Sequence, residues 1–168
     1  EKGIMTLSGS QPRLYVYSLN IQDVEAEVDF MRVGTSGVGW SGGNIGIRSD
    51  VEGHGLSHHL AHTYYFRLKH GQQLDFYREE QHGSNKTGVI HTRKFNWDIG
   101  IWYKMKFRCY NLSNNKIKLE GYINGKLELE YIDTSKIMYE ARGVVFLRNT
   151  DIKSAKYKNL SIKQYKLN

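Results

Sequence analysis

The chain has 168 residues, 39% of them hydrophobic, with a single cysteine and a formal net charge of +7. This length suits one domain with a real core, and a single cysteine excludes a fold held together by internal disulfides. No stretch approaches the roughly 20 consecutive apolar residues of a membrane-spanning helix, so we expect no membrane partner.

Strand patterns follow one another along almost the whole chain. Alternation of apolar and polar residues over short runs is typical of half-buried β-strands. In chain order, the expected strands cover residues 13–19, 24–33, 44–48, 63–69, 73–80, 88–93, 101–111, 116–124, 126–132, 143–148 and 155–163. Residues 34–43 have the composition of a flexible loop, and only residues 51–62 hold a candidate helical turn.

The strongest turn signal is Asn124-Gly125, which separates two of these strands. A two-residue type I′ turn needs positive φ at both central residues, and Asn and Gly tolerate this conformation. The chain also has one proline and 17 glycines, with turn signals at short and regular spacing. The sequence therefore predicts an all-β sandwich or barrel that forms a single domain over residues 1–168.

The run TYYFRLKHGQQLDFYREE, residues 63–80, predicts a hairpin with two chemically different faces. We expect the core face to carry Tyr64, Phe66, Leu68, Leu74 and Phe76. The other face should carry Tyr65, Arg67, Lys69, Asp75, Tyr77 and Glu79. This second face has more aromatic and charged side chains than a merely solvated sheet requires.

Several segments resemble, in the same order, the concanavalin A-like lectin/glucanase superfamily. The similar pieces are DVEAEVDF at 23–30, NIGIR at 44–48, YYFRL at 64–68, WYKMKFRCYNLSNNKIKLEGYINGKLELEY at 102–131, GVVFLR at 143–148 and AKYKNLSIK at 155–163. The chain looks nearest to the 3-keto-disaccharide hydrolase-like domain and to levan-type carbohydrate-binding modules. The resemblance implies a jelly-roll β-sandwich of two curved antiparallel sheets, in which members hold sugars on the concave face or at its rim.

In such a sandwich, the polar side of the hairpin would form the floor of a sugar-binding groove. Aromatic rings such as that of Tyr65 stack on the C–H faces of sugars, and Arg or Asp side chains bind paired hydroxyls or carboxylates. We therefore expect polysaccharide or oligosaccharide binding, with acidic glycans favoured by the net charge. The predicted ligand-binding residues are Arg48, Tyr65, Arg67, Asp75, Tyr77, Phe146, Arg148 and, from the glycine-rich loop, Trp40. A solvated face whose side chains pair only with one another is the plainer alternative.

Two other functional classes stay open on the same fold. A polysaccharide lyase would need a His or Tyr base, a Tyr acid and an Arg for the uronate, and all these residue types are present. The glucanase branch uses an E-x-D-x-x-E strand, but here Glu27 and Asp29 are followed by Arg32, so this hydrolase chemistry lacks its second carboxylate. A protein-interaction domain of the laminin G type is the other class, and it predicts an exposed apolar patch.

No cofactor is expected, and we assign no metal ligand. Four histidines have the spacing of ligands on one helical turn: His54, His58, His59 and His62. An exposed loop rich in glycine and histidine is the simpler interpretation, although metal binding stays open. Candidates for a structural calcium ion are Asp50, Asp98 and Asp151, but no D-x-D-x-D run occurs.

Three remaining expectations concern reactivity, nucleic acid and location. Cys109 alternates with core residues, which predicts a buried thiol that behaves as a small hydrophobe. The cations Lys104, Lys106 and Arg108 alternate in the same way and predict a solvated sheet face. Because no RNP, zinc-finger or helix-turn-helix signature occurs, we expect no nucleic-acid partner. Residues 1–10 lack the apolar segment of a signal peptide, so we interpret the chain as a trimmed form of an extracellular or cell-surface protein.

Overall fold

The computed structural model of the chain describes residues 3–8, 13–34, 42–49, 62–80, 88–140, 143–150 and 154–165, some of them as backbone only. These residues form twelve strands and one short helix, α1 (Lys136–Glu140). The predicted all-β fold is confirmed, while the helical turn considered for residues 51–62 lies outside the described part. Within the described ranges, no helix has the length and the apolar run needed to cross a membrane.

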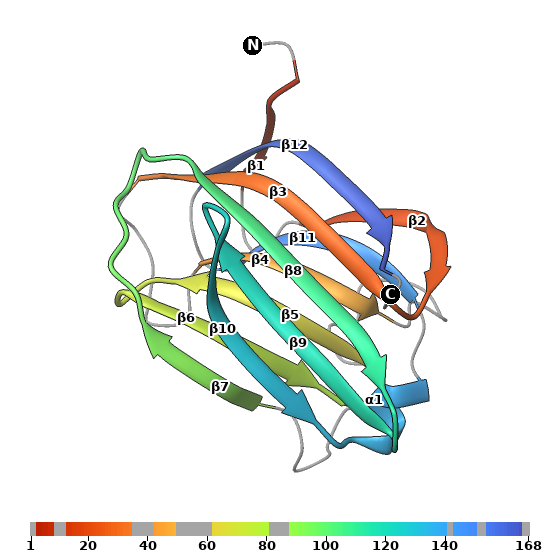
Figure 1. Ribbon diagram of the computed structural model, residues 1–168. Coiled ribbons are helices and arrows are strands. Elements are labelled where there is room, and N and C mark those ends of the chain that lie inside the picture. The colour runs from red at the N-terminus through yellow and green to blue at the C-terminus, as the bar shows by residue number, and fades with distance from the viewer. Residues whose placement is uncertain are drawn as a thin grey trace.

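The strands form two six-stranded antiparallel sheets that pack face to face (Figure 1). The sheet nearer the viewer, called the front sheet, has the order β1 (Met5–Ser8), β12 (Ser154–Gln164), β3 (Val24–Val33), β8 (Tyr103–Leu112), β9 (Lys116–Ile123) and β10 (Lys126–Asp133). The back sheet has the order β2 (Arg13–Ile21), β11 (Gly143–Thr150), β4 (Gly42–Ser49), β5 (Thr63–Lys69), β6 (Gln73–Glu79) and β7 (Gly88–Lys94). This is the predicted two-sheet antiparallel jelly-roll sandwich.

Alternation along the strands places one side of each sheet in the core. The inward positions of β3 are Val24, Ala26, Val28 and Phe30, all buried. The inward positions of β8 are Tyr103, Met105, Phe107 and Cys109. Burial raises the pKa of the Cys109 thiol to about 12, so the prediction of a buried cysteine is confirmed.

Two glycines let the sheets approach closely, because each makes room for a phenylalanine of the opposite sheet. A Cβ atom at Gly43 of β4 would lie 2.2 Å from Cε2 of Phe30 in the front sheet. A Cβ atom at Gly121 of β9 would lie 2.6 Å from Cε2 of Phe66 in the back sheet. Real Cβ atoms do not come this close, so the spacing of the sheets depends on having no side chain at either position.

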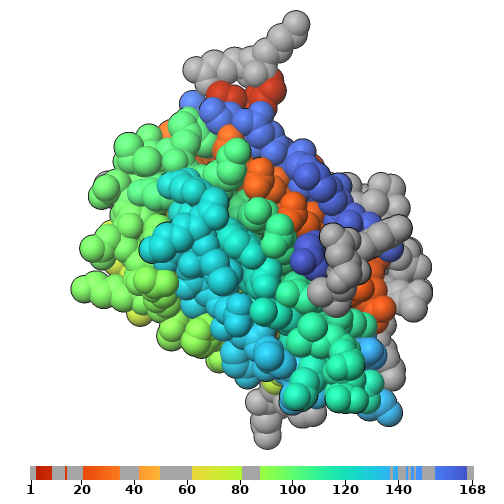
Figure 2. All heavy atoms as spheres, viewed as in Figure 1, coloured from red at the N-terminus to blue at the C-terminus, as the bar shows by residue number. Residues whose placement is uncertain are grey.

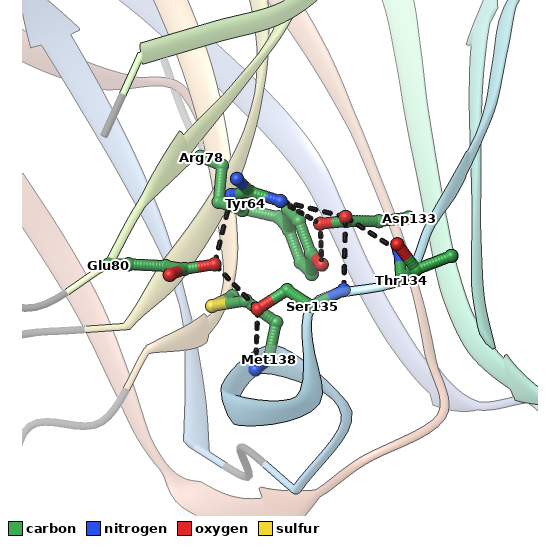
Figure 3. Close-up of polar contacts among 7 residues, drawn as sticks. All are labelled: Tyr64, Arg78, Glu80, Asp133, Thr134, Ser135 and Met138. Atoms are coloured by element: carbon green, nitrogen blue, oxygen red, sulfur yellow. Dashed lines mark hydrogen bonds and ion pairs between the residues drawn. The ribbon is translucent and has the colours of Figure 1, made fainter. Parts of the chain in front are cut away.

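One end of the sandwich is closed by α1 and a buried polar cluster (Figure 3). Asp133, at the end of β10, accepts hydrogen bonds from Tyr64 Oη (2.5 Å) and from Arg78 Nη1 (2.7 and 2.8 Å). Arg78 also pairs with Glu80 (3.1 Å), which accepts a hydrogen bond from Ser135 Oγ (2.5 Å). Burial, together with Asp133, raises the pKa of Tyr64 far above its ordinary value. The cluster ties the hairpin of the back sheet to the front sheet and to α1.

In Figure 2 the strands of the front sheet form a continuous outer surface. On this face Arg108 donates to Glu25 (2.5 Å) and forms a second ion pair with Glu120 (3.6 Å). Glu120 also accepts hydrogen bonds from the hydroxyls of Tyr110 (3.0 Å) and Tyr122 (2.8 Å). The face predicted to be solvated therefore also holds a network of ion pairs and hydrogen bonds.

Candidate ligand-binding face

Strands β5 and β6 form the predicted hairpin in the back sheet, paired Tyr65 to Tyr77 and Arg67 to Asp75. The five side chains predicted for the core are all fully buried: Tyr64, Phe66, Leu68, Leu74 and Phe76. The alternate positions therefore lie on the outer face of the back sheet, as the sequence predicts. We call the following set the polar face: Tyr65, Arg67, Lys69, Asp75 and Tyr77 of the hairpin, with Arg148 of β11.

A buried carboxylate organises one half of the polar face. Asp75 is 0% exposed although it lies on the outer side of the sheet. Its two oxygens accept hydrogen bonds from Arg67 Nε (2.6 Å) and Arg67 Nη2 (2.8 Å), and Lys69 Nζ lies 3.2 Å from Oδ2. A ligand cannot touch a carboxylate covered in this way. Asp75, predicted to contact ligand, instead holds Arg67 and Lys69 in place.

Two tyrosine rings occupy the centre of the polar face. Tyr65 and Tyr77 meet edge to face, with ring centroids 5.8 Å apart. The guanidinium carbon of Arg67 lies 4.2 Å from the centroid of the Tyr77 ring. Tyr65 is only 3% exposed, and its hydroxyl donates to Glu79 (2.6 Å), so the prediction of an open stacking ring at Tyr65 is wrong. Tyr77 is the half-buried ring of the pair and the one a ligand can reach.

The tyrosine hydroxyl of Tyr77 stays protonated near neutral pH. Burial raises its pKa, and Glu79 acts in the same direction, while Arg67 and Arg148 act against them. Because the net shift is upward from an ordinary pKa of about 10, the Tyr77 hydroxyl is available as a hydrogen-bond donor.

Arg148 reaches the hairpin from the other side of β4. It lies directly opposite Asn44, which in turn lies opposite Arg67. The guanidinium carbon of Arg148 is 5.9 Å from the centroid of the Tyr65 ring, so its side chain crosses β4. Gly46, the residue of β4 opposite Tyr65, has no side chain to block this crossing. Strands that are not neighbours in the sheet therefore contribute to one face.

Arg48 does not belong to the polar face, and the prediction that it lies on the groove floor is wrong. Its φ of +55° places it in the left-handed region, at an irregularity where the register of β4 against β11 shifts. The bulge turns its side chain inward, where it is 0% exposed. The guanidinium donates to the backbone oxygens of Gln22 (2.8 Å) and Met138 (2.9 Å) and to Asn111 Oδ1 (2.9 Å). Arg48 is a structural residue that ties α1 to both sheets.

Two predicted site residues are only partly accounted for. The backbone of Phe146 lies in β11, opposite Tyr15 on one side and Gly46 on the other, next to the polar face. Its side chain lies outside the described part of the chain. Trp40 also lies outside the described residues. The structure thus brings together Tyr65, Arg67, Asp75, Tyr77 and Arg148 of the eight predicted residues.

Sequence reasoning placed Lys69 and Glu79 on the outer side of the hairpin but chose neither as a binding residue. Both have the same strand parity as the chosen residues, so period-two alternation assigned them to the correct side of the sheet. What the sequence could not reveal is that Lys69 shares the carboxylate of Asp75 with Arg67.

Other groups considered for catalysis or metal binding lie away from the polar face wherever the structure describes them. Arg32, which stands where a glucanase would have its second carboxylate, points into the sandwich and packs its guanidinium over Trp97 (5.6 Å). His91 stacks on Tyr131 of β10, at 5.8 Å, and not on the polar face. Among the described residues, no group of three or more His, Cys, Asp or Glu could hold a metal ion. His54, His58 and His59 lie outside these residues.

No family model matches the chain, and no curated protein is significantly similar to it in sequence. Solved structures, in contrast, share its fold. The carbohydrate-binding module CBM66 from Bacillus subtilis is 19% identical over 97% of this chain and 83% of its own, with a TM-score of 0.60. The metal-free carbohydrate recognition domain of Emp46p is 14% identical over 99% of this chain and 85% of its own, with a TM-score of 0.65.

A third similar structure is a Bacillus subtilis protein of unknown function with a galectin-like fold. It is 12% identical over 95% of this chain and 81% of its own, with a TM-score of 0.67. At these identities the likeness shows the fold alone. The chain has the concanavalin A-like, galectin-like sandwich that the sequence resemblance implied.

Proposed function

We propose that this domain binds polysaccharides or oligosaccharides through the polar face, with acidic glycans favoured. The observation that carries the proposal is the row formed by Arg148, Tyr65, Tyr77 and Arg67, in which two guanidinium groups pack on two adjoining rings. Side chains held in this way lose little rotamer freedom when a ligand binds, which favours affinity. The carbohydrate-binding proteins of the same fold support the proposal by analogy.

The donors and acceptors of the polar face favour an anionic ligand. Arg and Lys side chains only donate hydrogen bonds, and Tyr77 adds a further hydroxyl. Asp75, the one acidic member of the polar face, is buried, and Glu79 beside the face already accepts a hydrogen bond from Tyr65. A neutral sugar has hydroxyls that need acceptors as well as donors, whereas a carboxylate or sulfate only accepts. The net charge of +7 adds long-range attraction for such a ligand. We also propose that the protein binds its glycan outside the cell or at the cell surface.

Binding is tested on a glycan array, followed by calorimetric titration of the glycans that bind. Tyr77→Ala and Arg67→Ala should each weaken binding at least tenfold, as expected for interface Tyr and Arg residues. Tyr122→Ala is the matched control, because Tyr122 is also a half-buried tyrosine under a guanidinium, on the front sheet (5.1 Å from Arg108). The proposal would be wrong if no glycan on the array bound the protein, or if Tyr122→Ala lost as much glycan affinity as Tyr77→Ala.

Cleavage of the glycan is the chief rival, and it gives a different readout. A lyase acting on polyuronates creates an unsaturated product end that absorbs in the ultraviolet. Incubation of the protein with a polyuronate panel should produce no such absorbance if the domain only binds. Steady product formation would make the domain an enzyme instead.

A protein-interaction role has one observation in its favour. Ile99 and Ile101, both exposed, flank Gly100, whose backbone nitrogen donates to the carbonyl of Arg32 next to exposed Val33. Three exposed apolar side chains are far fewer than the roughly 20 to 30 residues that each partner contributes to a standard interface. Loss of partner capture in Ile101→Ser, with glycan binding absent from the array, would favour this role.

A further inference from the structure

The polar face contains two cations that share one carboxylate. Lys69 Nζ and Arg67 Nη2 lie 3.2 and 2.8 Å from the same oxygen, Oδ2 of Asp75. The side chains of Arg67 and Lys69 are only 11% and 12% exposed, and that of Asp75 is 0% exposed. The trio therefore carries one net positive charge at a place with little water around it.

Other ion pairs of the molecule differ from this trio either in charge balance or in burial. On the front sheet Arg108 pairs with both Glu25 and Glu120, and Lys118 pairs with both Glu120 and Glu130. Each of those cations has two carboxylates. At the polar face the ratio is reversed, since no other described carboxylate forms an ion pair with Arg67 or Lys69. Arg93 and Lys126 do share one carboxylate, that of Glu128, but their side chains are 49% and 72% exposed and therefore well solvated.

An uncompensated charge in a poorly solvated place is unfavourable, because desolvation weakens its hydration without giving it a partner. The same low polarity strengthens the attraction between this charge and any anion that reaches it. Asp75 accepts hydrogen bonds from Nε and Nη2 of Arg67 and pairs with the ammonium group of Lys69. Arg67 Nη1 and the other ammonium hydrogens of Lys69 can donate hydrogen bonds to a bound anion.

We propose that Arg67 and Lys69 form a subsite for a carboxylate or sulfate group carried by the glycan, with Asp75 as the residue that positions both cations. This inference rests on the proposed function. It adds Lys69 as a binding residue and states where on the polar face the anionic group of the glycan binds. The bound anion restores charge balance, so that two cations face two anions.

The first experiment compares tetragalacturonate with its methyl ester, which has the same sugar without the charge. Lys69→Met should weaken binding of the acid about tenfold or more, the loss expected for a charge-assisted hydrogen bond, and weaken binding of the ester much less. Lys104→Met is the matched control, because Lys104 lies on the front sheet and pairs with one carboxylate of its own, Glu27 (3.7 Å). A sulfated tetrasaccharide serves as a second arm and separates sulfate from carboxylate as the preferred group. Equal losses for acid and ester in Lys69→Met would overturn the subsite while leaving glycan binding in place.

The second experiment needs no glycan. Sodium sulfate should raise the melting temperature of the wild-type protein more than that of Lys69→Met, because generic salt effects act on both proteins alike. Without sulfate, Lys69→Met should melt at the same temperature as wild type or higher, since it removes an uncompensated charge. An equal sulfate effect in both proteins overturns the subsite. A specific sulfate effect together with a blank glycan array would uphold the subsite and reject the proposed function.

Asp75→Asn separates positioning from simple electrostatics. The substitution raises the net charge of the trio, so a site governed by charge alone would bind tetragalacturonate more tightly. If Asp75 positions the cations, binding of the acid should instead weaken severalfold. Tighter binding in Asp75→Asn would overturn the positioning role.

Discussion

At the scale of single residues, we expect Arg48 to stabilise the fold and not to bind ligand. Replacing it with Met removes the donors that satisfy the carbonyls of Gln22 and Met138 and the side chain of Asn111. Breaking a buried charged network of this kind costs about 3–5 kcal/mol. Urea unfolding of Arg48→Met should show this loss, whereas Arg93→Met, at an exposed arginine, should lose less than about 1 kcal/mol. A variant Arg48→Met that keeps its stability but loses glycan binding would show that Arg48 is a binding residue.

Glu120 gives a prediction for pH at the same scale. Burial alone would raise its pKa, but hydrogen bonds from Tyr122 and Tyr110 and the nearby Lys118 outweigh burial and lower it. A carboxyl whose pKa is lower in the folded state stabilises the fold above the unfolded pKa of about 4.3, and this stability is lost as pH falls through the folded value. Glu120→Gln should therefore be less stable than wild type at pH 7, with a difference that shrinks in urea unfolding at pH 3. A difference that grows toward pH 3 would contradict this account.

Among the elements, the hairpin of β5 and β6 offers the sharpest contrast between core and face. Phe66 is fully buried and packs on Phe76 and Phe107, so Phe66→Ala should destabilise the domain by about 3–5 kcal/mol. Half-buried Tyr77, on the opposite side of the hairpin, should lose less than half as much on replacement by Ala, yet it should lose glycan binding. Thermal unfolding and titration of the two variants measure both effects. If Tyr77→Ala unfolds the domain while Phe66→Ala is silent, the strand faces are assigned the wrong way round.

Period-two alternation predicted the strands with one apolar face, and it did so correctly for β3, β5, β6 and β8. It could not predict the short β1 or α1, because neither is long enough to display a period. It also failed at Arg48, where a bulge with positive φ reverses the direction of one side chain without any local sequence signal. In the candidate site, alternation identified the face but not the depth of each side chain. Asp75 is covered by side chains of the neighbouring strand β5, and Arg148 of β11 reaches Tyr65 across β4; only the assembled sheet reveals such cover.

For the whole molecule, the separation of the two sheets depends on the glycine at position 43. Phe30 has little freedom to move away from a new side chain there, because its ring also packs against Tyr157 (5.4 Å) and Trp97 (6.5 Å). Gly43→Ala should therefore destabilise the domain by about 1–3 kcal/mol through overpacking. Gly88→Ala is the matched control, since a Cβ atom at this other strand glycine would meet nothing within 4 Å. It should change stability by less than about 1 kcal/mol.

The cause of that loss can be tested by adding space on the opposite sheet. Phe30→Leu shortens the side chain that would meet the new Cβ, so the double variant Gly43→Ala/Phe30→Leu should be more stable than the sum of the single changes implies. Residues in contact across a packed core couple by about 0.5–3 kcal/mol, which urea unfolding of the four proteins in the cycle can resolve. Strict additivity would mean that the alanine acts within the back sheet alone, and that the approach of the two sheets does not depend on this glycine.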